Sequence, residues 1–192
     1  MAHYAISEAL IVLAGLWAAL RLYRQARPAA AFAIMLFSFA ALLGVIRFAF
    51  DRQAEMAEIH RLAGTLGGLA AMMALVFEMI DRRGVRLDNW RQRYLLAAAL
   101  GLGLAISLAW LRVPLFLLLS VTFIILVVKS APLLGRRVPV AMMMAGIMLV
   151  NVVVFRQAAW LSPAVAWHVF HVLVAVGLVA LGLLLYPPRR SA

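Results

Sequence analysis

Apolar residues run along the chain in seven long blocks, which short polar and basic stretches separate. The blocks cover Tyr4–Tyr23, Ala29–Phe50, His60–Ile80, Tyr94–Leu111, Val113–Val128, Val138–Phe155 and Val165–Tyr186. Most of them approach the roughly 20 residues that a helix needs to cross a bilayer. None alternates with the period of two that is typical of a membrane strand, so the pattern predicts transmembrane helices.

The fourth and fifth blocks are short, and only the segment "LRVP", residues 111–114, joins them. A single helix through both blocks would overshoot a hydrocarbon core of about 30 Å. Arg112 supplies a polar stop and Pro114 a helix break, so two separate helices are expected here. The sequence therefore predicts seven spans.

Composition indicates that lipid is the outer solvent of this fold. Of the 192 residues, 67% are hydrophobic and 13% are charged, and the mean hydropathy is +1.04. A water-soluble domain needs a polar shell, and this chain has too few polar residues to make one. We predict an all-α, polytopic membrane protein in which residues 1–192 form one domain, a single bundle of seven transmembrane helices.

The formal net charge of +11 comes from basic residues in short clusters between the blocks. Thirteen of the 18 Lys and Arg fall on one side of the predicted membrane, namely Arg21, Arg24, Arg27, Arg82, Arg83, Arg86, Arg91, Arg93, Lys129, Arg136, Arg137, Arg189 and Arg190. The positive-inside rule then places the N-terminus outside and the C-terminus in the cytoplasm. Such clusters differ from the single basic patch of a nucleic-acid-binding protein, so no nucleic acid partner is expected.

Histidines gather at the outer end of the predicted bundle. His168 and His171 lie in the first two turns of the last helix, and His60 opens the third. His168 and His171 are three residues apart, so they share one face of a helix. Ionisable residues within a span are costly and point to function, although side chains in the outermost turn also face headgroups or water.

We predict a metal site at this end, with His60, His168 and His171 as ligands. Glu8, Asp51 and Glu58 are further candidate ligands if the first, second, third and seventh helices adjoin.

The segment "AVAWHVFHVL", residues 164–173, resembles the start of the seventh helix in the alkaline ceramidase and CREST superfamily of seven-helix membrane hydrolases. In that family a His-x-x-x-His pair, with Trp before its second histidine, supplies two zinc ligands, and a third histidine ends the second helix. Trp167 and His168 match the second half of this motif. Ala164 stands in place of the first histidine, and Arg47 in "ALLGVIRFAFD" stands in place of the second-helix ligand. The resemblance implies a divergent hydrolase with an incomplete zinc motif.

Zinc with three protein ligands keeps one position open, lowers the pKa of bound water to about 7 and polarises a carbonyl. For this chemistry we expect Asp51 or Glu58 as the base, and Arg47 or Asn151 as the group that stabilises the oxyanion. The substrate would be a lipid amide or ester. We therefore expect a bacterial inner-membrane protein whose site faces the periplasm.

Two other functions stay open at this point. The segment "HRLAGTLGG", residues 60–68, places small residues after a histidine, so haem b between His60 and either His168 or His171 is one alternative. The glycines also fit ordinary helix packing. A non-catalytic receptor or partner subunit is the other alternative. Membrane lipids are partners in every case, and nothing in the chain indicates an oligomeric state.

Overall fold

The structure is a computed structural model that describes residues 2–82, 89–130, 137, 139, 140, 144, 147, 151 and 160–185. Its regular elements are α1 His3–Tyr23, α2 Pro28–Ala49, α3 Ala57–Leu62, the π-helix η1 Ala63–Gly67, α4 Gly68–Arg82, α5 Trp90–Ser107, the 3₁₀ turn η2 Ala109–Leu111, α6 Arg112–Lys129 and α9 Pro163–Leu184. Every element in this part of the chain is helical, which confirms the all-α class. The sixth predicted block, Val138–Phe155, lies largely outside the described residues.

Five helical segments are long and apolar enough to cross a membrane, as expected of an integral membrane protein. They are His3–Tyr23, Pro28–Ala49, Ala57–Asp81, Ala109–Lys129 and Pro163–Leu184. The fourth predicted block also forms a helix, α5, but it is not among the five. Arg91 and Arg93 in its first turn lower its mean hydropathy. The count of seven spans and the orientation of the chain stay predictions.

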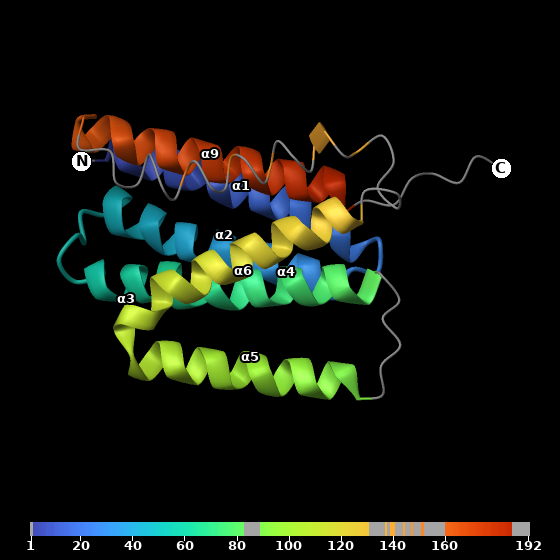
Figure 1. The fold of residues 1–192 in the computed structure, drawn as a ribbon. Helices are drawn as coiled ribbons and strands as arrows, with labels where there is room; N and C mark the ends of the chain where they lie inside the picture. Colours follow the sequence, from blue (N-terminus) through green and yellow to red (C-terminus); the bar gives the residue numbers. More distant parts are fainter. Residues whose placement is uncertain are drawn as a thin grey trace.

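The helices pack side by side, with α1 between α2 and α9, and α4 between α2 and α6 (Figure 1). Small residues allow the closest approaches. A Cβ atom built on Gly15 would lie 1.8 Å from the Ser38 hydroxyl of α2, and one on Gly182 would lie 2.9 Å from the Cβ of Ala18. Such small-residue contacts let membrane helices approach closely and gain van der Waals packing.

The connection between α5 and α6 differs from the prediction. The helix breaks at Leu108, whose backbone is extended at φ −120° and ψ 90°, and so before the "LRVP" segment. Arg112 does act on this end of α5, because its Nε donates to the carbonyl of Ala105 at 2.8 Å. Pro114 lies in the first turn of α6, where a missing backbone N–H costs nothing.

One end of the bundle, called the histidine end below, gathers the start of α1, the end of α2, α3 and the starts of α6 and α9 (Figure 1). Ser162 and Pro163 begin α9 there as cap and first residue, as their residue types predict. At the opposite end, Arg27 bonds Glu78 at 3.2 Å and Arg91 bonds Asp81 at 2.7 Å. These pairs hold the start of α2 and the start of α5 against α4.

Candidate functional site

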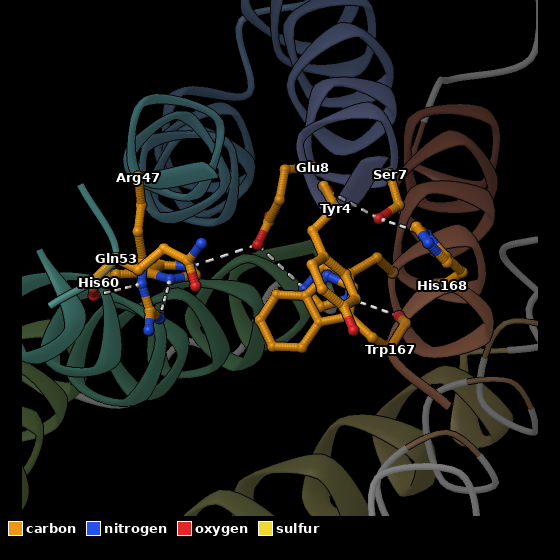
Figure 2. A network of polar contacts seen from close by, with 9 residues as sticks. Tyr4, Ser7, Glu8, Arg47, Gln53, His60, Trp167 and His168 are labelled. Atoms are coloured by element: carbon orange, nitrogen blue, oxygen red, sulfur yellow. Dashed lines mark hydrogen bonds and ion pairs between the residues drawn. The ribbon is translucent and has the colours of Figure 1, made fainter. Parts of the chain in front are cut away.

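Three side chains from separate helices meet at the histidine end and form what we call the Glu8 cluster: Glu8 of α1, His60 of α3 and His171 of α9. The Oε1 atom of Glu8 lies 3.4 Å from His60 Nε2 and 3.2 Å from His171 Nε2. In Figure 2 the Glu8 carboxylate reaches away from α1 into the space between its neighbours. Only 1% of Glu8 is exposed, so a full carboxylate is buried beside two titratable rings.

The two imidazoles are the polar contacts of Glu8 Oε1 among the described residues, and both lie at ion-pair distance, without the strict geometry of a hydrogen bond. A buried carboxylate in this state needs a proton or a cation close by. Ligands about 2.0–2.1 Å from a tetrahedral zinc ion lie roughly 3.3–3.4 Å from one another. The two measured distances are close to that spacing.

The Nδ1 atoms of His60 and His171 have partners other than Glu8, and these contacts indicate the tautomer of each ring. His171 Nδ1 lies 2.7 Å from the carbonyl oxygen of Trp167, so it donates its proton there and leaves a lone pair on Nε2 facing Glu8. A backbone carbonyl on the far nitrogen is a common way to orient a metal-binding histidine. His60 Nδ1 lies 3.4 Å from Arg47 NH1, which can only donate. In this arrangement the proton of a neutral His60 sits on Nε2.

The side-chain types of the Glu8 cluster are ones that bind zinc. Two imidazoles and one carboxylate are a known catalytic zinc set. Among the described residues no three His, Cys, Asp or Glu side chains are already arranged around an ion. To act as a ligand through Nε2, a neutral His60 must carry its proton on Nδ1, and Arg47 NH1 must turn away from that atom. Arg47 is also held by its Nε, which donates to the carbonyl of Gln53 at 3.1 Å.

Haem b would need a larger rearrangement of the same rings. In bis-histidine ligation the iron lies between the two coordinating nitrogens. Here Nε2 of His60 and Nε2 of His171 both lie within 3.4 Å of the Glu8 carboxylate oxygen, which would have to move before an iron could bind both rings. The geometry therefore favours a single metal ion or a proton over a macrocycle.

Local structure explains how the Glu8 cluster forms. A Cβ atom on Gly44 of α2 would lie 2.4 Å from Glu8 Oε1, so only glycine leaves room for the carboxylate. His60 lies just before the π-helix η1, and π-helical turns often occur at functional sites because they displace the helix face. The indole of Trp167 stacks on His171, with 4.3 Å between ring centroids and 25° between planes, and fixes the ring orientation.

A cavity of about 980 Å³ opens beside the Glu8 cluster. All three cluster residues line it, together with Arg47, Arg61, Arg112, Asn151 and Trp167 and many apolar side chains. Asn151 donates to the carbonyl of Phe170 at 2.9 Å, but its Oδ1 has no hydrogen bond from the described residues. The indole nitrogen of Trp167 is also buried and has no hydrogen-bond partner among the described residues. Among the described residues, Asn151 Oδ1 and the Trp167 indole N–H are thus an acceptor and a donor without a partner in the cavity wall.

His168 lies apart from the Glu8 cluster, although sequence reasoning grouped it with His60 and His171. Its Nδ1 donates to the hydroxyl of Ser7 at 3.1 Å, and its ring stacks on Tyr4 (Figure 2). Three residues of an α-helix turn the side chain by about 300°, which leaves neighbours at this spacing some 60° apart. The two imidazoles therefore contact α1 in different places.

The other predicted site residues divide into two groups. Arg47 and Asn151 line the cavity. Asp51 and Glu58 are exposed and do not line it: Asp51 accepts from Gln53 at 2.9 Å, and Glu58 pairs with Arg61. Sequence reasoning ranked Glu8 only among the alternative ligands. The signal for it was present, because Glu8 is the one acidic residue in the first apolar block.

Comparison with known proteins finds no matching family model, no matching curated protein and no matching solved structure. The likeness to the CREST superfamily therefore stays an expectation from residues 41–51 and 164–173.

Proposed function

We propose that the protein is an integral membrane hydrolase that cleaves an amide or ester bond of a lipid. Glu8, His60 and His171 would hold a metal ion such as zinc. The observation that carries this proposal is the buried Glu8 Oε1, which lies 3.2 and 3.4 Å from two imidazole nitrogens on the wall of a large cavity. His168, part of the ligand set expected from sequence, has no role in this centre.

Zinc at this position would supply a Lewis acid that activates water near pH 7 and polarises a carbonyl. Glu8 is the only carboxylate among the described residues lining the cavity, so its oxygens take the proton released from water. Arg47 turns its guanidinium from His60 to the carbonyl oxygen and stabilises the negative charge that develops there. Asn151 Oδ1 accepts a hydrogen bond from a substrate N–H, which favours amides.

We propose further that the histidine end faces the periplasm of a bacterial inner membrane. The basic clusters that end α1 and begin α5 lie at the opposite end, which supports this orientation through the positive-inside rule. A lipid would then enter from the outer leaflet. A divergent origin within the CREST superfamily is compatible with a ligand set rebuilt around Glu8.

The test combines metal analysis with an assay on fluorescent lipid amides and esters, using protein purified in a neutral detergent. We expect about one zinc per chain, and hydrolysis that a chelator removes and added zinc restores. His171→Gln should lose both. The matched control, His168→Gln, changes the same residue type three positions earlier on α9 and should keep both.

Three outcomes would overturn the proposal. A Soret band in the optical spectrum would establish haem. Protein that stays metal-free in excess zinc and hydrolyses none of the lipids would establish a non-catalytic role. Loss of metal in His168→Gln but not in His171→Gln would move the centre away from Glu8.

A further inference from the structure

The cavity wall carries more positive than negative charge at the histidine end. Among the described residues, three arginines line it, Arg47, Arg61 and Arg112, against the one carboxylate of Glu8. Arg61 is already neutralised by Glu58, to which its Nε donates at 2.8 Å. Arg47 and Arg112 form no ion pair with any carboxylate in the described part of the chain. Arg112 also lies within electrostatic range of Glu58. Three arginines still outnumber the carboxylates of Glu8 and Glu58, so positive charge is left over for a bound anion.

Arg112 is the better placed of the two for a bound headgroup. Its Nε and NH2 donate to the carbonyls of Ala105 and Ile106, at 2.8 and 3.4 Å. These bonds fix the guanidinium at the start of α6. These bonds leave donors unused, and carbonyls do not cancel a formal charge. A fixed, half-buried guanidinium of this kind favours phosphate or carboxylate.

The remainder of the cavity wall is apolar and extends along α9. Val174, Leu178 and Leu181 follow His171 at helical spacing, and Ile11, Phe37 and Phe116 also line the cavity. Leu181 is ten residues beyond His171, which corresponds to about 15 Å along the helix axis. An alkyl chain fits such a wall. The cavity therefore combines the cationic side chain of Arg112, the Glu8 cluster and this apolar wall, which we call the apolar arm.

We infer that the cavity binds an amphiphile with one acyl chain joined, through an amide or ester, to an anionic headgroup. Arg112 would bind the headgroup, the apolar arm would hold the chain, and the bond between them would lie beside the Glu8 cluster. The inference rests on the proposed hydrolase only in naming its substrate; binding itself requires no metal. Hydrolysis would add water across the C–N or C–O bond and release a carboxylic acid and an amine or alcohol.

Binding is measured without turnover, on the full chain in neutral detergent with chelator present, by calorimetry and native mass spectrometry. The probes are dodecyl phosphate, dodecanol and inorganic phosphate. We expect dodecyl phosphate to bind at least about tenfold more tightly than dodecanol, and inorganic phosphate to show no binding at the same concentration. Equal affinities for the phosphate and the alcohol, or binding of free phosphate alone, would overturn the inference.

Gly64→Leu tests the cavity itself. A Cβ atom on Gly64 meets no atom within 4 Å, and Gly64 lines the cavity, so a leucine side chain should project into it and weaken dodecyl phosphate binding about tenfold or more. Gly103→Leu is the matched control: its Cβ space is equally open, but it does not line the cavity. Equal binding by both variants would show that the amphiphile binds elsewhere.

Arg112→Gln should remove the preference for dodecyl phosphate over dodecanol, whereas Arg112→Lys should keep most of it. Arg93→Gln, an exposed charge in the first turn of α5, should leave it unchanged. Arg112 also holds the end of α5, so thermal unfolding is measured for each variant. If Arg112→Gln does not fold, the comparison of Gly64→Leu with Gly103→Leu still tests whether the amphiphile binds in the cavity. Binding without hydrolysis would overturn the proposed hydrolase alone, and hydrolysis without headgroup preference would overturn this inference alone.

Discussion

Two glutamates are buried in this membrane protein, and they lie at opposite ends of the bundle. Glu8 on α1 is 1% exposed and Glu78 on α4 is 4% exposed, so burial does not distinguish them. Their partners do. Glu78 accepts a hydrogen bond from Arg27 at 3.2 Å, whereas Glu8 faces two imidazoles at ion-pair distance.

The difference lies in whether the partner's charge is permanent. Arginine stays protonated at any physiological pH, so the pair of Arg27 and Glu78 is neutral and fixed. Imidazole gains and loses protons near neutral pH and binds metals. Glu8 also lines a cavity of about 980 Å³, whose lining does not include Glu78. A buried acid therefore points to chemistry when its partners are exchangeable and a ligand can reach it.

Removal of the two charges gives the largest expected contrast. Glu8→Gln should lose bound metal and reduce hydrolysis by about 1000-fold or more, because a neutral amide is a poor ligand and no base. Glu78→Gln should keep metal and activity but lower the free energy of unfolding by about 1–3 kcal/mol, because Arg27 loses its charged partner. Metal content, hydrolysis rate and chemical denaturation measure the two effects. If Glu78→Gln lost activity while still folded, the two ends would not differ as described.

Gly44→Ala should disturb Glu8 without changing any titratable group. The new Cβ atom would lie 2.4 Å from Glu8 Oε1, so the carboxylate must move away from both imidazoles. We expect metal affinity to fall about 10–100-fold, as for loss of a group that orients a ligand. Overpacking should also cost about 1–3 kcal/mol of stability. The readouts are a zinc titration and thermal unfolding.

Gly103→Ala controls for the loss of a helical glycine, since its Cβ position is open. It should leave metal affinity unchanged. Unaltered zinc binding in a folded Gly44→Ala variant would mean that Glu8 is not a ligand.

The fold could be predicted from sequence wherever one local pattern decided it. Long apolar blocks gave α1, α2 and α9 to within two residues at each end, because span length and hydropathy are properties of the segment alone. Ser162 and Pro163, which begin α9 as cap and first residue, are residue types that favour these two positions. The break before α6 was predicted at residues 111–114, but the helix ends at Ser107. Arg112 follows this break and donates back to the carbonyl of Ala105 in α5.

The site was harder to predict, because it depends on how helices turn against one another. His168 and His171 share a helix face in sequence, yet one contacts Ser7 and the other Glu8. Glu8 became central only once Gly44 was seen to leave space for it. Helix rotation and interhelical distance are set by packing across the whole bundle, and no window of sequence contains them.

The smallest effect concerns Arg47, and it separates binding from turnover. Arg47 NH1 lies 3.4 Å from His60 Nδ1 and opposes the tautomer that ligates metal, so Arg47→Gln should bind zinc at least as tightly as the parent protein. The same change removes a donor to the developing oxyanion, so the turnover number should fall about 10–100-fold. Arg52→Gln, a change at an exposed arginine paired with Glu55, should alter neither quantity. Weaker zinc binding in a folded Arg47→Gln variant would show that Arg47 supports His60 as a ligand. It would contradict the view that the contact between Arg47 NH1 and His60 Nδ1 opposes metal binding.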